Sequence, residues 1–342
     1  MVSHPVEEFK LTKSTLMETV VISHPGDVSS LVFETKRIPT AIGANLVVRV
    51  RAIGINRADS LQRQGLYPMP PGLGNVPGLE LAGEVEAIGP DVQRYKVGDR
   101  VFALVAEGAY AEYCLVDEGL ALPIPPNWNF AKAAAVMEVA CTTNETVFEL
   151  GELKAEQTIL VHAGASGVGT TAIQMAKSVG AQVLFTAGSQ EKIDLVCSIG
   201  GDMGINYHVE DFVDSVIRTV GNRGVDLIQD LVGGDYLMRN INLLRNTWRL
   251  VLVGALRGAK TEFDIGPMLK HRLKIFGFTL RAQTLEDKRQ IVSRIEKRWL
   301  PKYIDGTIKP IIHAELPFSE VRNAHLLMDQ NVNFGKLILE IN

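Results

Sequence analysis

In the stretch Thr158-Ile-Leu-Val-His-Ala-Gly-Ala-Ser-Gly-Val-Gly-Thr-Thr-Ala-Ile-Gln-Met-Ala-Lys177, an apolar strand runs through a glycine-rich turn straight into a helix. Such a turn presents free backbone N–H groups and the positive end of the helix dipole to a phosphate. Gly164 and Gly169 hold the outer positions of the pattern G-x-G-x-x-G, with Ser166 at the middle glycine. We therefore expect a pyrophosphate to bind against four residues: Ser166, Gly167, Val168 and Gly169.

The same turn has two other interpretations. A tight strand-to-helix turn that binds no ligand would use the same glycines. A hydrolase nucleophile elbow, with Ser166 as nucleophile, needs the pattern G-x-S-x-G, and Val168 stands where its last glycine belongs. The hydrolase interpretation is therefore set aside, and the neighbouring segments must decide between the other two.

Around this turn, strand-like and helix-like segments alternate. Helices are predicted over Ala131–Leu150, Thr170–Ser178 and Glu191–Ser198. The strand candidates between and after them are Thr158–His162, Gln182–Thr186, Val225–Asp230, Arg249–Val253 and Lys274–Leu280. This alternation is typical of an α/β fold with a doubly wound parallel sheet, which binds ligands at the carboxyl ends of its strands.

The first part of the chain has a different pattern. From about Glu18 to Asp117 it alternates short strands and turns, as in Leu46–Ile53 and Leu81–Gly89, which predicts a small β-rich barrel. The last strand candidate begins at Lys336, and we expect it to pair back onto this first part.

The end of the second strand indicates which nicotinamide cofactor is used. An NAD site normally has Asp or Glu about 20 residues past the glycines, to bind the ribose 2′-hydroxyl. This chain has Thr186-Ala-Gly-Ser-Gln-Glu-Lys192 there. Ser189 and Lys192 leave room and positive charge for a 2′-phosphate, and Tyr207 follows the third strand, so we expect NADPH. Ser189 also fits a simple helix cap, which is compatible with both roles.

Composition narrows the class of protein. A net charge of −4, 46% hydrophobic and 22% charged residues are values of a globular protein, and no long basic run favours nucleic acid. We expect a small-molecule ligand and no membrane span, and the charge disfavours nucleic acid as a partner. Three scattered cysteines and a start without an apolar h-region favour the cytoplasm.

A family resemblance rests on three further segments in fixed order before the glycine-rich turn. They are Gly54-Ile-Asn-Arg-Ala-Asp59, Pro77-Gly-Leu-Glu-Leu-Ala-Gly-Glu-Val85 and Val97-Gly-Asp-Arg-Val101. With that turn they resemble the medium-chain dehydrogenase/reductase superfamily, and within it the zinc-free quinone oxidoreductases of the zeta-crystallin-like branch.

The resemblance implies a domain division. A GroES-like β-rich catalytic domain would comprise residues 17–140 and 305–342, and a Rossmann NADPH-binding domain residues 141–304. A cleft would lie between them, and the Rossmann sheets would join homodimers or dimers of dimers. Residues 1–16 would form an N-terminal extension outside the resemblance.

The positions of the superfamily's catalytic zinc ligands carry unsuitable side chains. A catalytic Zn²⁺ needs Cys, His or carboxylate ligands and an open position. By the resemblance, the ligand positions fall at Asn56, Leu79 and near Glu138, and the aliphatic Leu79 binds no metal. Cys141 lies close by but is better interpreted as a small buried residue. The clustered cysteines of the structural zinc lobe are missing, so we expect no metal.

Reduction of a conjugated acceptor suits a metal-free site. Hydride addition to a quinone or enone leaves an anion delocalised onto a carbonyl oxygen, whereas alcohol oxidation leaves an alkoxide that usually needs zinc. The resemblance places Asn56 beside the nicotinamide ribose and the substrate oxygen, and Tyr67 at the mouth of the cleft; a turn-forming Asn and a loop-covering Tyr are the structural alternatives. The further expected cofactor contacts are Thr142, Gly254, Leu256, Phe278, Leu280 and Asn333.

Three functions remain open at this point. The leading one is NADPH-dependent reduction of quinones or related conjugated carbonyl compounds. The second is an enoyl or alkenal reductase on the same scaffold. The third is a nucleotide-binding protein with a structural or RNA-associated task, which the acidic balance disfavours.

Overall fold

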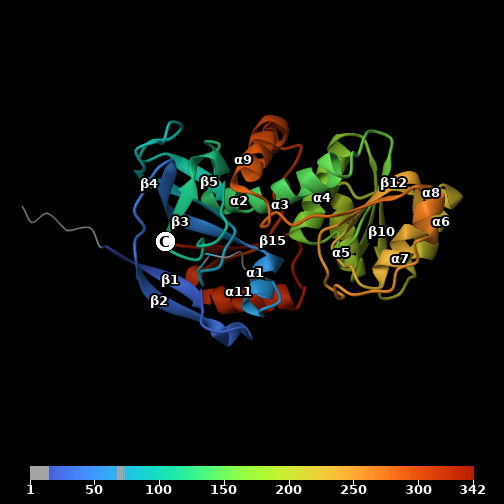
Figure 1. Cartoon of the computed structure of the whole chain (residues 1–342), viewed down its shortest axis with the longest axis horizontal. Coiled ribbons are helices and arrows are strands. Elements are labelled where there is room, and N and C mark those ends of the chain that lie inside the picture. The colour runs from blue at the N-terminus through green and yellow to red at the C-terminus, as the bar shows by residue number, and fades with distance from the viewer. Residues whose placement is uncertain (1–14, 68–71, 73) are drawn as a thin grey trace, which may run out of the picture.

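The computed structural model describes residues 15–67, 72 and 74–342. Of the predicted extension 1–16, residues 1–14 lie outside the described residues, and Leu16 already begins a strand. The described chain forms two parts side by side, one around a largely antiparallel sheet and one around a parallel sheet. Helices α3 (Met137–Thr143) and α4 (Gly167–Ser178) lie between them (Figure 1).

The second part is the predicted doubly wound sheet. All its neighbouring strands are parallel. Their order across the sheet is β10 (Met203–Asn206), β9 (Gln182–Ala187), β8 (Thr158–Val161), β11 (Val225–Asp230), β12 (Leu244–Leu252) and β13 (Lys274–Gly277). This order reverses direction between β8 and β11, and such switch points are where open α/β sheets bind nucleotides.

Both faces of this sheet are buried, which explains its apolar strands. Ile159 and Val161 of β8 belong to a core cluster shared with the helices beside the first part, whereas Leu160 packs in the cluster on the opposite face. Helices cover both faces. They are α4 (Gly167–Ser178), α5 (Gln190–Ser198), α6 (Phe212–Val220), α7 (Tyr236–Ile241) and α8 (Gly266–His271).

The first part is built on a largely antiparallel sheet and a separate hairpin of β1 (Leu16–Ile22) and β2 (Leu31–Arg37). The sheet strands in order are β14 (Ile312–Pro317), β15 (Lys336–Glu340), β3 (Asn45–Ile55), β4 (Glu80–Ile88), β5 (Arg100–Leu104) and β7 (Ala121–Pro123), with β6 (Tyr113–Asp117) on β3. The tail strand β15 pairs antiparallel with β3, so the expected return of the chain is confirmed (Figure 1).

The remaining helices border this first sheet or connect the two parts. They are α1 (Arg57–Arg63), α2 (Phe130–Ala134), α3 (Met137–Thr143), α9 (Leu285–Arg294), α10 (Leu300–Ile304) and α11 (Val321–Asp329). The division into domains at residues 140/141 and 304/305 stays a prediction.

The helix predicted over Ala131–Leu150 is wrong as one element. It breaks at Ala135 and Val136 into α2 and α3, and continues as a π-helical stretch over Asn144–Glu149. The break has a cause far away in the sequence. The break leaves the first N–H groups of α3 without partners inside the helix. One of them, the backbone N–H of Glu138, donates to the buried carboxylate of Glu80 at 2.9 Å.

Strand bounds also differ from the sequence prediction. β12 begins at Leu244 rather than Arg249, and β13 ends at Gly277 rather than Leu280. The short strand β10 is the third strand expected before Tyr207, but it was given no bounds among the candidates, because Met-Gly-Ile-Asn gives too little apolar pattern. The earlier end of β13 leaves Phe278 and Leu280 beyond the carboxyl edge of the sheet.

Candidate active site

The glycine-rich turn has the geometry of a phosphate-binding turn. Ser166 is the N-cap of α4, and its hydroxyl accepts a hydrogen bond from Gly169 N at 3.0 Å. The first intrahelical bond runs from Thr170 N to Ser166 O, so the N–H groups of Gly167 and Val168 precede the helical ladder. A Cβ on Gly167 would lie 2.8 Å from Cδ of Lys336, so only glycine permits this approach. The turn can therefore present its backbone to an anion.

A group of polar side chains lies at the ends of β9 and β10. Ser189 caps α5, accepting from Lys192 N at 3.2 Å, so its capping role is real. The hydroxyl of Tyr207 would lie 2.7 Å from a Cβ on Gly188, and the Tyr207 ring packs on His208 at 4.5 Å. The Lys192 ammonium donates to the carbonyl of Asn331, and partial burial lowers the pKa of Lys192. These residues form one small polar surface.

The other expected cofactor contacts lie at the same edge of the sheet or face it. Asn333 is buried and donates to Gly335 O at 2.7 Å, while Gly335 N donates to Ala165 O at 2.8 Å, which ties the tail to the glycine-rich turn. The remaining predicted contacts follow strand ends or lie in α3. The most exposed of them is Leu256, at 49%. They are Thr142 (α3), Gly254 and Leu256 (after β12), and Phe278 and Leu280 (after β13).

The positions of the superfamily's zinc ligands do not form a donor set. Leu79 is buried and aliphatic, and Cys141 is buried with its thiol directed to Met137 Sδ at 3.8 Å. Burial raises the pKa of Cys141 well above its ordinary value, which suits a small core residue. Among residues 15–67, 72 and 74–342, no group of three or more His, Cys, Asp or Glu side chains could hold a metal ion.

A buried ion pair between Lys336 and Glu80 contacts two of the positions that correspond to zinc ligands, Asn56 and Glu138. The Lys336 ammonium donates to Glu80 Oε1 at 2.6 Å, to Asn56 Oδ1 at 2.6 Å and to the carbonyl of Ile55 at 2.7 Å. The side chains of Lys336 and Glu80 are 4% and 0% exposed. Asn56 Nδ2 donates to Glu80 Oε1 at 3.0 Å and to Gly54 O at 3.1 Å. Both amide hydrogens of Asn56 are thus in use, and its expected donation to a substrate stays a prediction.

Further charged groups join this pair. Arg281 is buried, and its guanidinium donates to Gln62 Oε1 at 2.8 Å. Asp59 is fully buried and accepts from Asn56 N at 2.8 Å, and Glu138 lies in the first turn of α3. We call the following set the central charged cluster: Asn56, Asp59, Glu80, Glu138, Arg281 and Lys336.

Burial changes the acidity of two carboxyls in this cluster. Desolvation raises the pKa of Asp59 to about 6, against the opposing effect of its hydrogen bond from Asn56. Desolvation and the neighbouring Glu80 raise the pKa of Glu138 to about 8, although Lys336 lowers it. A group with such a pKa can hold a proton near neutral pH and release it.

Tyr67 faces the same cluster. The Arg281 guanidinium lies over its ring, 5.0 Å from the centroid. Burial, and next the charge of Glu138, raise the pKa of Tyr67, so its hydroxyl stays protonated and is a weaker acid than usual. The structure therefore brings Asn56 and Tyr67, the two residues predicted to be catalytic, to one charged site with ionisable partners that the sequence analysis did not name. Their roles in catalysis stay predictions.

Those added residues had recognisable sequence signals. Glu80 and Lys336 are charges at the first residues of β4 and β15, each next to apolar residues, in Gly-Leu-Glu-Leu-Ala and Gly-Lys-Leu-Ile-Leu. A charge in such a strand is almost always paired when buried. Arg281 directly follows the strand-end segment Phe278–Leu280, where ligands of open α/β sheets bind.

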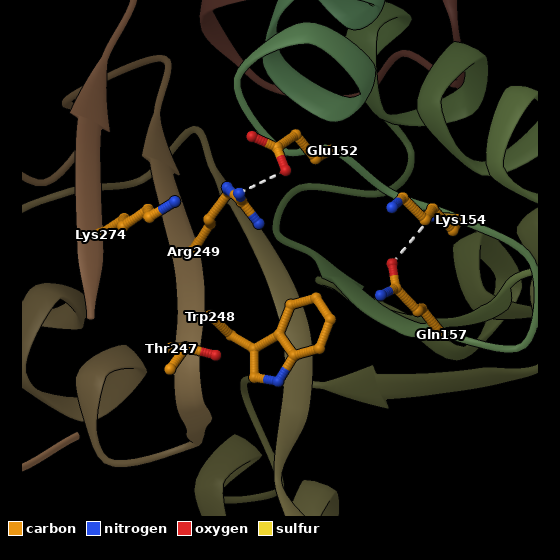
Figure 2. A pocket seen from close by; sticks show the side chains of 7 residues that line it. All are labelled: Glu152, Lys154, Gln157, Thr247, Trp248, Arg249 and Lys274. Carbon is orange, nitrogen blue, oxygen red and sulfur yellow. Dashed lines mark hydrogen bonds and ion pairs between the residues drawn. The ribbon is translucent and has the colours of Figure 1, made fainter. Parts of the chain in front are cut away.

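A separate hollow lies at the opposite end of the parallel sheet (Figure 2). Its volume is about 230 Å³, and it opens beside the first residues of β8 and β13. Arg249 within it pairs with Glu152 at 2.5 Å. Since parallel sheets bind ligands at the carboxyl ends of their strands, this hollow is not part of the candidate active site. Its lining is Glu152, Lys154, Gln157, Thr247, Trp248, Arg249 and Lys274.

Comparison with known proteins agrees with this architecture. The family model for the alcohol dehydrogenase GroES-like domain matches residues 43–126, and that for zinc-binding dehydrogenases matches residues 167–297. The synaptic vesicle membrane protein VAT-1 homolog of Rattus norvegicus is 33% identical over 319 residues, covering 88% of this chain and 78% of that protein. The quinone oxidoreductase of Mus musculus is 31% identical over 310 residues, covering 88% and 91%.

A solved structure is similar over nearly the whole chain. The Escherichia coli quinone oxidoreductase complexed with NADPH superposes with a TM-score of 0.86 at 28% identity, covering 96% of this chain and 100% of the other. None of the described helices is long and apolar enough to span a bilayer.

Fold and site together define a two-part oxidoreductase that uses a nicotinamide cofactor and a small-molecule substrate. The chain belongs to the medium-chain dehydrogenase/reductase superfamily, among the relatives of quinone oxidoreductase. The α/β class and the resemblance predicted from the sequence are confirmed.

Proposed function

We propose that this protein is an NADPH-dependent, metal-free reductase of quinones or related conjugated carbonyl compounds. The observation that carries the cofactor preference is the polar surface at the ends of β9 and β10. It offers the hydroxyls of Ser189 and Tyr207 and the ammonium of Lys192. The end of β9, Ala187-Gly-Ser, has no carboxylate to bind a ribose 2′-hydroxyl or repel a 2′-phosphate.

The residues present fit a dinucleotide along the whole edge of the sheet. The turn from Ser166 to Gly169 would bind the pyrophosphate, and Gly188 leaves space beside the Tyr207 hydroxyl that a Cβ would fill. The remaining contacts continue this line toward the central charged cluster, and we assign them to the cofactor too: Thr142, Gly254, Leu256, Phe278, Leu280 and Asn333.

The central charged cluster supplies what the substrate end needs. When bound, the cofactor supplies a hydride, which leaves negative charge on the carbonyl oxygen of a conjugated acceptor. Arg281 and Lys336 bring positive charge without a metal. We assign Tyr67 to shaping the acceptor site, and Asn56 to holding Lys336 in place, so that the ammonium stabilises the charge that develops at that oxygen.

Steady-state kinetics test this function. NADPH and NADH oxidation is measured with ortho-quinones, para-quinones, alkenals and enoyl thioesters. We expect quinones to give the highest kcat/KM. Dominant turnover of an enoyl thioester would move the protein to the enoyl reductases, and no turnover with any acceptor would favour a binding protein instead.

The cofactor preference has its own test in Lys192→Ala. Loss of one partly exposed charge contact to the 2′-phosphate costs about 1–3 kcal/mol, roughly 5- to 150-fold in NADPH affinity, with little change for NADH. Lys177→Ala is the matched control, because Lys177 pairs with Asp202 on the surface at 2.8 Å. An unchanged NADPH/NADH ratio in Lys192→Ala contradicts the assignment.

We propose further that the protein works as a homodimer or dimer of dimers in the cytoplasm. β13 is the last strand of the parallel sheet, so one of its edges is open in the described chain. Exposed apolar side chains precede it: Phe263, Ile265 and Leu269. Light scattering after gel filtration distinguishes the states, and a monomer at micromolar concentration contradicts the proposal.

A further inference from the structure

Within the central charged cluster, Glu138 is the residue whose carboxyl is available to interact with a bound molecule. Its backbone N–H is used, since it donates to Glu80 Oε2 at 2.9 Å. Its side chain is half-buried, and no hydrogen bond or ion pair joins its carboxyl to another residue of the described chain. Glu80, by contrast, is committed to Lys336, and Asp59 is fully buried and accepts from Asn56 N. Glu138 alone combines access with a free carboxyl.

The surroundings favour the neutral form of this carboxyl. Burial is the main reason that the pKa of Glu138 is raised to about 8, and the negative charge of Glu80 is the second reason. At pH 7 most Glu138 side chains therefore carry a proton. The ionisable groups whose charges interact with this carboxyl come from several elements: Asp59 (α1), Tyr67 (after α1), Glu80 (β4), Cys141 (α3), Arg281 (after β13), Lys288 (α9) and Lys336 (β15).

We propose that Glu138 is the general acid that protonates the carbonyl oxygen of the acceptor as the acceptor is reduced. The inference rests on the proposed function and names the proton donor of that same site. The O–H bond of the Glu138 carboxyl breaks, and a new O–H bond forms on the acceptor oxygen, which holds the electron pair displaced by the incoming hydride. Water then returns a proton to the Glu138 carboxylate, so one hydride and one proton are consumed in each turnover.

The other candidate acid is weaker in this setting. Tyr67 lies beside Glu138, and burial together with the Glu138 charge raises the pKa of its hydroxyl above its ordinary value of 10.0. A catalytic acid is most effective when its pKa lies near the working pH. Glu138 meets that condition and Tyr67 does not, so the proton comes from the carboxyl and Tyr67 forms a wall of the site.

The first test reads the proton directly and needs neither cofactor nor turnover. Difference infrared spectroscopy of the free protein follows the carbonyl stretch of a protonated carboxyl from pH 5 to pH 10. The wild type is expected to lose one such signal with a midpoint near pH 8, and Glu138→Gln to lack it. Glu149→Gln is the matched control, since Glu149 forms only a long surface pair with Arg298, 3.8 Å. A signal that persists in Glu138→Gln overturns the proposal.

The second test uses the acceptor that the wild type reduces best. Glu138→Gln is expected to lower kcat by about 10²–10⁴-fold with a small change in KM, the usual contribution of a placed acid. The fall of the wild-type rate above about pH 8 should disappear in this variant. Cofactor affinity and the thermal unfolding midpoint are measured alongside, and Glu138→Asp, which keeps an acid, should recover part of the rate.

The outcomes separate the two proposals. A wild type that reduces no acceptor refutes the function, whatever the infrared result. A wild type that turns over, with Glu138→Gln folded and within about tenfold of its rate, refutes the role of Glu138 and leaves the function standing. If Glu138→Gln does not fold, the infrared titration and the rate of Glu138→Asp decide. A pH profile of the Glu138→Asp rate that is identical to that of the wild type would also refute the role of Glu138.

Discussion

Replacement of Lys336 by Met should destabilise the first sheet strongly. The Met side chain keeps the apolar stem that passes Gly167 but removes the ammonium and its three hydrogen bonds of 2.6, 2.6 and 2.7 Å. Glu80, 0% exposed, would then be a buried charge without its cation. Breaking a buried pair in this way costs about 3–5 kcal/mol.

A double-mutant cycle measures this interaction. Urea unfolding and hydrogen exchange of the β15 amides are followed for Lys336→Met, Glu80→Gln and the double variant. The double variant should regain much of the loss, because no charge is left unpaired. Lys177→Met removes a surface pair with Asp202, with side chains 35% and 37% exposed, and should cost only about 0–1 kcal/mol.

Two results would refute this reasoning. If Lys336→Met were as mild as Lys177→Met, the buried pair would contribute no specific stability. If the losses of the two single variants simply added, Lys336 and Glu80 would act independently, despite their distance of 2.6 Å.

Three other predictions concern the site. Tyr67→Phe should keep kcat/KM for a quinone within about tenfold, whereas Asn56→Ala should lose up to ~10²-fold; the reverse order would make Tyr67 the acid. Metal analysis of purified protein should give far less than one equivalent of zinc and chelators should not inhibit, and stoichiometric zinc would contradict our interpretation of Leu79. Because the folded pKa of Glu138, about 8, lies above its ordinary 4.5, its contribution to stability is complete below about pH 4.5 and is lost as pH rises to 8. Urea unfolding should therefore show a smaller loss of stability between pH 5 and pH 8 in Glu138→Gln than in the wild type.

Local pattern was enough to predict the parallel sheet and the grouping of strand-end residues at its carboxyl edge. The strand over Thr158–Val161, the turn and α4 form one continuous signal, because strand, glycines and helix follow each other directly. Carboxyl ends of parallel strands share one edge, so residues far apart in the sequence, such as Ser166 and Leu280, were expected on the same side of the sheet. The pairing of β15 with the first part of the chain was also predicted, from the apolar run at the end of the sequence.

The charged site could not be predicted in the same way. Glu80 and Lys336 are 256 residues apart, and their pairing depends on β15 lying beside β3 and β3 beside β4. The break between α2 and α3 depends on the same distant carboxylate, which accepts from Glu138 N. Helix propensity alone favours a continuous helix through its alanines. Only the tertiary structure reveals why the chain turns there.

The charges of the cluster explain how a site without a metal donor set can still handle a developing oxyanion. With Glu138 protonated, the carboxylates of Asp59 and Glu80 stand against the cations Arg281 and Lys336, so the cluster is close to neutral. Transfer of the Glu138 proton creates one new carboxylate while the acceptor oxygen becomes neutral. The negative charge thus moves within reach of the same two cations, which lower the pKa of Glu138 and so stabilise its ionised form. Because the charge shifts over a short path and stays close to these two cations, the low polarity that raises the pKa of Glu138 becomes compatible with rapid proton transfer.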